Sequence, residues 1–221
     1  MINVFIGFDE GEKVSYHILS ESIRRQSSVP VSITPLCLSN IPEFKRELQP
    51  NQSTEFAFSR FLVPYLSDYK GWSLFLDSDM MFRDDIKNLW DMIDKDKSIM
   101  CCKHDYVPKQ NVKFRGAKNE PFPKKNWSSF MLMNNERCKM LTKEFVETAT
   151  GLELHQFNWT HEENIGELPL ELNWLVSEYD YNKNAKNVHW TLGGPYFKDY
   201  AKSDYADEWF RLYNETIEID L

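Results

Sequence analysis

The sequence lacks several features that identify particular classes of protein. No apolar run reaches the roughly eighteen residues needed to span a membrane. The opening INVFIGFDE has neither a basic segment nor a long apolar one, so we expect no signal peptide. No Pro/Gly/Ser-rich linker and no repeat of twenty to fifty residues is present. We therefore expect one domain over residues 1–221 and a cytoplasmic location, with the inner face of a membrane as an alternative.

Positive charge and cysteine motifs are also scarce. The chain has 26 Lys and Arg against 34 Asp and Glu, a net charge of −8. This balance disfavours duplex nucleic acid or an anionic membrane as the main partner, because both are bound by clustered Lys and Arg. Its four cysteines have no CxxC or other metal-binding spacing. We expect them to be reduced, packed thiols.

The residues that are present predict an α/β fold. Hydrophobic residues make up 42% of the chain, enough for one sizeable core. Apolar runs predict strands at 2–8, 29–38, 72–76, 98–104 and 128–135, and helical spacing predicts helices at 14–26, 55–66, 84–94 and 138–151. We expect Pro64 to kink the second helix and Gly151 to close the last. Alternating strands and helices predict a mostly parallel sheet, followed from about residue 152 by a smaller, irregular part.

The most informative pattern is the pair of aspartates after the apolar segment WSLFL. In an extended chain Asp77 and Asp79 lie on one side and Ser78 on the other. Their Cα atoms are then about 6.5–7 Å apart, so both carboxylates can approach one cation. Two carboxylates completed by phosphate oxygens suit Mg²⁺ or Mn²⁺ better than a closed calcium cage. The simpler alternative is a turn that caps the helix starting near Asp85.

Two other enzyme classes use related patterns. Phosphatases with an aspartyl nucleophile need Thr or Val two residues after the second aspartate, where this chain has Met81. Nucleotide-sugar pyrophosphorylases need a Gly-rich basic loop after the first strand, where this chain has GFDEGEK. A metal-dependent phosphohydrolase remains an alternative.

Several segments together resemble a known family. The chain resembles the GT-A fold glycosyltransferases, most of all the family-eight retaining galactosyl and glucosyl transferases and small bacterial and viral relatives. The resemblance lies in the order of five segments: STEFAFSRFLVPYL, FLDSDMMF, KNWSSFMLMNN, IGELPLELNWLV and VHWTLGGPYF. The resemblance implies a nucleotide-binding half over about 1–110 and a sugar and acceptor half over about 111–221. It also implies hexose transfer from a UDP-sugar, such as UDP-glucose or UDP-galactose, to a saccharide, glycolipid or other hydroxyl acceptor.

The same resemblance assigns residues to the metal and the nucleotide. It makes Asp77, Asp79 and His189 ligands of Mn²⁺ or Mg²⁺, with Asp79 central to catalysis. The residues placed at the nucleotide are Asp9, Arg60, Asp77, Ser78, Gly193, Gly194 and Lys198. Three of the residues assigned to the metal and the nucleotide have a simpler alternative: His189 as a structural histidine, Asp9 as a helix cap, and Arg60 as a solvated side chain. From the helical period, Arg60 leaves the packed stripe and faces the cleft.

A third group of residues is implied for the sugars and the reaction. His104, Asp105, Trp127, Ser128 and Ser129 fall where family members contact the donor sugar or the acceptor. Glu162 and Glu163 fall near the acidic and amide pair beside the anomeric carbon. The alternative for these two is an acidic pair on a solvated loop.

The chain departs from the family in one motif. The family's late motif reads HxxGxxKPW, with a lysine on the diphosphate, whereas HWTLGGPYF has no lysine there. Backbone N–H groups of Gly193 and Gly194 could approach the phosphates instead. The missing positive charge must then come from Arg60, Lys198 or the metal. A catalytically silent nucleotide-sugar-binding module is the main rival function.

Overall fold

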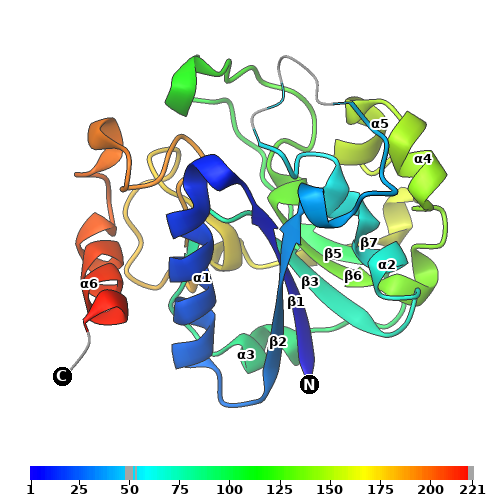
Figure 1. Cartoon of the computed structure of the whole chain (residues 1–221), viewed down its shortest axis with the longest axis horizontal. Coiled ribbons are helices and arrows are strands. Elements are labelled where there is room, and N and C mark those ends of the chain that lie inside the picture. Colours follow the sequence, from blue (N-terminus) through cyan, green and yellow to red (C-terminus); the bar gives the residue numbers. More distant parts are fainter. Residues whose placement is uncertain (48–51, 53, 219–221) are drawn as a thin grey trace.

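The computed structural model describes residues 1–47, 52 and 54–218, which contain two sheets and the helices around them (Figure 1). The larger sheet contains β1 (Ile2–Phe8), β2 (Val31–Cys37), β3 (Trp72–Leu76), β5 (Ile99–Cys102), β6 (Phe130–Asn134) and β7 (Ile165–Leu168). The smaller contains β4 (Met80–Phe82), β8 (Trp174–Leu175) and β9 (Asn187–His189). The α-helices are α1 (Lys13–Gln26), α2 (Val63–Leu66), α3 (Ile86–Trp90), α4 (Lys143–Thr148), α5 (Gly151–His155) and α6 (Ala206–Ile217).

The larger sheet is mostly parallel, as predicted, and has the strand order β2-β1-β3-β6-β5-β7. β1 pairs in parallel with β2 and β3, and β5 pairs in parallel with β7. β6 runs antiparallel to both β3 and β5. The carboxyl ends of β1, β3, β5 and β7 therefore lie at one edge, which is where open α/β sheets bind ligands.

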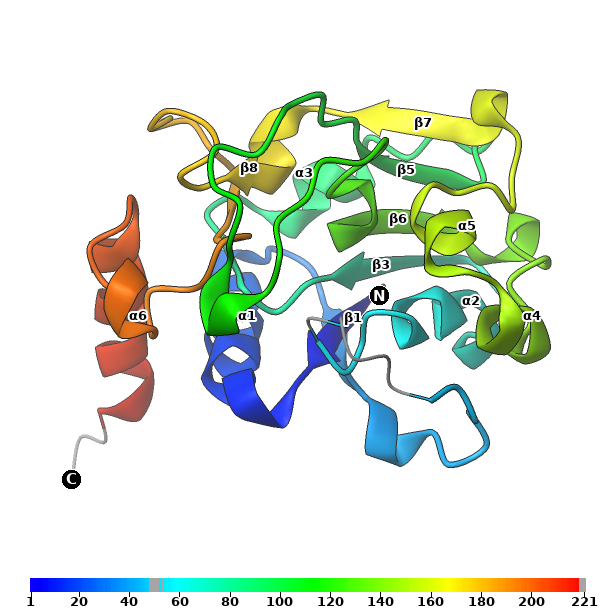
Figure 2. The ribbon, with the colours of Figure 1, turned by 90° about the horizontal axis from the view of Figure 1, so that it is seen from above.

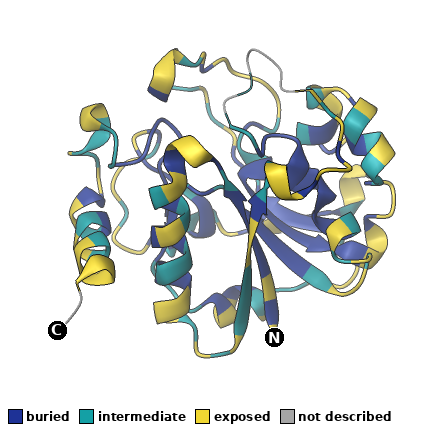
Figure 3. Ribbon diagram, in the orientation of Figure 1, coloured by how far each residue is buried: buried dark blue, intermediate teal, exposed yellow. Residues whose placement is uncertain are grey.

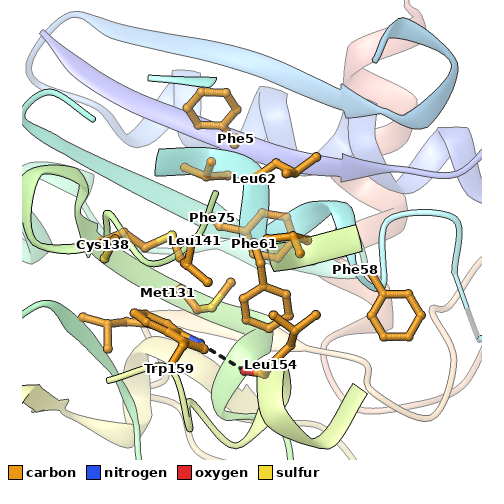
Figure 4. Close-up of a cluster of buried hydrophobic side chains, with 14 of the residues drawn as sticks. Phe5, Phe58, Phe61, Leu62, Phe75, Met131, Cys138, Leu141, Leu154 and Trp159 are labelled. Carbon is orange, nitrogen blue, oxygen red and sulfur yellow. Dashed lines mark hydrogen bonds between the residues drawn. The ribbon is translucent and has the colours of Figure 1, made fainter. Parts of the chain in front are cut away.

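The central strands of the sheet are buried on both faces, which explains their continuous apolar runs. Alternate residues of β3 pack on opposite sides: Phe75 joins one hydrophobic cluster, and Leu74 and Leu76 join the other. Figure 3 shows the central strands buried between helices whose outer surfaces are exposed. Figure 4 shows the first cluster, in which Trp159 Nε1 donates a hydrogen bond to Leu154 O.

The helices divide between these two faces. α1 and α3 cover one face, with Leu19, Ile23 and Leu89 in its core cluster. The segment leading into α2 and helices α4 and α5 cover the other face (Figure 2). α6 packs beyond α1 through a third cluster that includes Trp209. In the part of the chain that the structure describes, no helix combines the length and apolar character needed to cross a membrane.

The predicted helix over 55–66 is wrong for most of its length. Its residues form turns, then a 3-10 helix at Ser59–Leu62, and only the final turn is α-helical. Pro64 lies in the first turn of α2, where a missing N–H costs nothing, so it starts this helix instead of kinking it. The α-helical phase used to orient Arg60 therefore does not apply.

Three further predictions differ from the structure. Thr150 caps α5 with its side chain and Glu153 completes a capping box, so Gly151 opens a helix and does not close one. The helix expected over 84–94 is limited to α3, and its N-cap is Asp85, not either of the paired aspartates. The last third, expected to be irregular, contains the twelve-residue helix α6.

Candidate active site

The smaller sheet brings His189 to the two aspartates. β4 begins directly after Asp79 and pairs antiparallel with β9, which places Met80 opposite His189. The backbone N–H of Trp190 donates to the carbonyl of Asp79 at 2.9 Å. Two segments 110 residues apart are thus joined by ladder hydrogen bonds at the carboxyl edge of β3.

The side chains of Asp77, Asp79 and His189 form one group whose ligand atoms lie within 4.8 Å of one another. His189 Nε2 is 3.3 Å from Asp79 Oδ1, and the imidazole is 2% exposed. Its Nδ1 lies 2.9 Å from Oδ1 of Asn173, while Asn173 Nδ2 donates to Ser129 Oγ at 2.9 Å. The amide is thereby oriented to accept the Nδ1 proton, which leaves Nε2 with a lone pair facing the carboxylates.

This donor set suits a divalent metal ion. Two carboxylates and one imidazole match Mn²⁺ or Mg²⁺, and a metal-ligating histidine usually donates its other N–H to an acceptor, a place that the Asn173 amide oxygen takes here. Burial raises the pKa of Asp77 to about 6, even though Arg60 lowers it, so a further cation beside this carboxylate would favour its ionised form. Asp77, Asp79 and His189 are therefore the residues that would hold the ion.

Arg60 is not the cleft-facing side chain that the helical phase predicts. It is buried, and its Nη1 lies 2.7 Å from Asp77 Oδ1. The same nitrogen donates to the carbonyl of Ser128 at 2.9 Å, and the guanidinium carbon lies 5.1 Å from the Phe75 ring centre. Since this pairing uses the charge of Arg60 inside the protein, its first role is to compensate Asp77.

The segment before β6 supports the same edge of the sheet. Ser129 O accepts the backbone N–H of Asp77 at 2.9 Å, and Ser129 Oγ donates to Asn126 O. Ser128 Oγ is 2.6 Å from His155 Nδ1. Ser78, like these two serines, is buried. The hydroxyls of Ser128 and Ser129 thus have partners within the protein, and both residues help to hold Asp77 in place.

His104 lies close enough to His189 for their charges to interact, and Trp127 contacts His104, whereas Asp105 is exposed. Trp127 Nε1 donates to His104 O at 2.8 Å, and His104 Nδ1 lies 2.9 Å from the Tyr179 hydroxyl. Burial, followed by the nearby charge of His189, lowers the pKa of His104 to about 3. Among the described residues its buried Nε2 has no hydrogen-bond partner. A neutral imidazole with one free nitrogen therefore borders the site.

Asp9 caps the chain after β1, which was the simpler of its two predicted roles. Its Oδ1 accepts from Gly11 N at 2.8 Å and its Oδ2 from Glu55 N at 3.2 Å. Arg115 Nη1 lies 3.8 Å from Asp9 and 3.9 Å from the buried Glu12. Burial, and then Asp79, raise the pKa of Glu12 to about 7. Asp9 and Glu12 thus form an acidic pair at the end of β1, and Glu12 lies close enough to Asp79 for their charges to interact.

The glycines of the late motif serve packing. A side chain on Gly193 would collide with Tyr200, and one on Gly194 with Tyr196. The N–H of Gly193 already donates to Trp190 O at 2.8 Å, so it is not available to a phosphate, contrary to the prediction. Lys198 is exposed at the start of a 3-10 helix, Lys198–Tyr200.

Glu162 and Glu163 are not part of the group formed by Asp77, Asp79 and His189, and their role beside the anomeric carbon stays a prediction. They precede β7, whose parallel register pairs Ile165 with Ile99, the first residue of β5. They therefore precede the amino end of β7, whereas Asp77 and Asp79 follow the carboxyl end of β3. Both are exposed, and Glu162 pairs with Lys124 at 2.6 Å.

Sequence reasoning missed three residues at the site: Asn173, Glu12 and Lys113. Asn173 belongs to the segment IGELPLELNWLV that carries the family resemblance, so a signal for it was present. Glu12 and Lys113 belong to no motif, and only the folded chain brings them near Asp79.

A cavity of about 660 Å³ lies between α1, β4 and α6, away from the site. None of the site residues described above lines it.

Sequence comparison identifies the family. The model of Glycosyl transferase family 8 matches residues 12–192. Protein CDI of Arabidopsis thaliana is 42% identical over 222 residues, which cover 96% of this chain and 86% of that protein.

Solved structures agree with the fold. Galactosyltransferase LgtC, in complex with donor and acceptor sugar analogs, superposes with a TM-score of 0.64 at 11% identity, covering 99% of this chain and 97% of LgtC. The bifunctional glycosyltransferase WbbM gives a TM-score of 0.67 at 16% identity, covering 96% of this chain but only 49% of WbbM. The chain therefore belongs to glycosyl transferase family 8 and is a glycosyltransferase with the GT-A fold.

Proposed function

We propose that this glycosyltransferase uses Mn²⁺ or Mg²⁺ and transfers a hexose from a UDP-sugar, UDP-glucose or UDP-galactose, to a hydroxyl of a saccharide or glycolipid. The observation that carries the proposal is the group Asp77, Asp79 and His189, with Nδ1 of the histidine held by Asn173 and Nε2 turned to the carboxylates. Carboxylates alone would repel a diphosphate, so donor binding requires a cation between them.

In the proposed reaction the bond between the anomeric carbon and the β-phosphate oxygen breaks, and its electron pair stays on the phosphate. The acceptor oxygen forms the new bond to the anomeric carbon, and its proton passes to the departing diphosphate. A bound divalent ion would stabilise the charge on that diphosphate as a Lewis acid. We further propose retention of configuration, as the family resemblance implies.

The setting of the site supports a sugar acceptor near β5 and β6. Trp127 is partly buried beside His104, and aromatic faces of this kind stack on sugar rings.

The four cysteines are unpaired, which fits a reducing compartment such as the cytoplasm.

The test is turnover of a panel of UDP-sugars with Mn²⁺, followed by assay for free UDP, with and without a chelator. We expect the wild type to release UDP, at least by slow hydrolysis of the donor when no acceptor is present. This release should stop when a chelator is added, and it should be absent from the Asp79→Asn variant. Asp85→Asn, which changes a helix cap on the surface, is the matched control and keeps activity.

Two other outcomes separate the rival functions. Binding of UDP-sugars without any release of UDP would indicate a silent binding module. Release of inorganic phosphate would indicate a phosphohydrolase. UDP release that continues unchanged after chelation would refute the metal requirement.

A further inference from the structure

The site needs a positive charge for the diphosphate, and the residues expected to provide it do not. The late motif HWTLGGPYF has no lysine, and its residues 193–195 are buried. Arg60 is already paired with Asp77 and Ser128 O. Lys198 is exposed, and no contact of the described residues joins it to the aspartates.

Another cation lies at the site, on the segment between β5 and β6. This segment crosses the chain near His189: the N–H of Phe114 donates to Leu192 O at 2.8 Å, and Asn126 Nδ2 donates to Thr191 Oγ1 at 3.2 Å. Lys113, the residue before Phe114, is held in a tight turn by its own N–H, which donates to Ala117 O at 2.8 Å. Hydrogen bonds on both sides thus fix its backbone against the strand end that carries His189.

Lys113 lies close enough to the acidic group for its charge to interact with both aspartates. Asp79 and Asp77 raise the pKa of its ammonium, whereas burial lowers that pKa by more. In the part of the chain that the structure describes, Lys113 forms no ion pair within 4.0 Å, although Asp77 has one with Arg60. Its ammonium is therefore near the two aspartates and forms an ion pair with neither of them. By contrast Lys118, on the same segment, is 84% exposed and pairs with Glu120.

We propose that the ammonium of Lys113 binds the diphosphate of the sugar donor, in place of the lysine of the family's late motif. The inference rests on the proposed function, because it presumes a nucleoside-diphosphate donor at Asp77 and Asp79. A lysine offers a compact charge with three donors, which suits a phosphate oxygen. Before the donor binds, the same charge partly neutralises the aspartates, so Lys113 opposes the binding of a metal ion alone and favours the binding of a diphosphate.

These two effects have opposite signs, which separates a binding role from a structural one. Calorimetry on Lys113→Ala should show UDP binding in Mn²⁺ weakened at least tenfold and UMP binding changed less than threefold, since UMP lacks the second phosphate. Mn²⁺ alone should bind two- to fivefold more tightly than to the wild type, because a nearby positive charge has gone. Lys113→Arg should keep UDP affinity within threefold of the wild type, and Lys118→Ala should match the wild type throughout.

Each other result overturns the inference in a distinguishable way. If the wild type binds UDP and Lys113→Ala binds it equally well, Lys113 has no diphosphate role and the proposed function stands. If Lys113→Ala loses UDP, UMP and Mn²⁺ affinity together, the lysine only supports the fold. If the wild type binds neither UDP nor GDP in Mn²⁺, the proposed function and this inference both fail.

Discussion

Replacing Arg60 with alanine should destabilise the protein strongly, although the helical phase predicted a side chain that leaves the packed stripe and faces the cleft. The Arg60 and Asp77 side chains are 7% and 17% exposed, and the variant leaves Asp77 buried without its 2.7 Å partner. Removing one member of a buried ion pair costs about 3–5 kcal/mol. The guanidinium also lies 5.3 Å from the Phe56 ring and 5.1 Å from the Phe75 ring, and these contacts add to the loss.

The size of this loss should depend on pH with a defined sign. The pKa of Asp77 is about 6 with Arg60 present, and Arg60 lowers it, so the variant has a higher one. Between these two pKa values the folded variant keeps a proton that the folded wild type releases. The free energy of unfolding of the variant therefore falls by about 1.4 kcal/mol per pH unit relative to the wild type, and the deficit is smallest below about pH 6.

The assay is urea denaturation of metal-free protein at pH 5.5 and pH 8. Arg60→Met combined with Asp77→Asn should recover much of the loss, because neither charge is then left uncompensated. Arg24→Ala, which removes a guanidinium whose side chain is 68% exposed, is the surface control and should cost less than about 1 kcal/mol. A deficit below about 1 kcal/mol for Arg60→Ala, or one that does not change with pH, would refute the reasoning.

Two more predictions concern neighbouring residues. Asn173→Ala should weaken Mn²⁺ binding about 10- to 100-fold by titration, because the imidazole of His189 loses the amide that orients it; unchanged affinity would mean that the orientation is not needed. Glu12 has a folded pKa of about 7, so the wild type should lose stability as pH rises from about 4.5 to 7 and then level off. Urea denaturation at pH 5 and pH 8 measures this fall in the free energy of unfolding, and Glu12→Gln should make the fall smaller by roughly 3 kcal/mol. An equal pH dependence in both proteins would contradict the burial argument.

Much of the fold could be predicted because its strands are buried on both faces. Continuous apolar runs such as Ile2–Phe8 and Trp72–Leu76 produce β1 and β3 at the predicted residues. Short helices were harder, because their ends depend on caps such as Thr150 that also suit a turn. The helix predicted over 55–66 failed since its apolar spacing fits packing against the sheet by turns and a 3-10 helix equally well.

The sequence by itself determined the family, the strand that carries Asp77 and Asp79, and the chemistry that two adjacent carboxylates allow. Only the tertiary structure decided which distant residues join them. The register of β4 with β9 places His189 beside Asp79, and the chain's return between β5 and β6 places Lys113 there. It also decided that Glu162 and Glu163 precede the amino end of β7, because the direction of a strand, not the spacing of its residues, decides which end of a sheet a loop occupies.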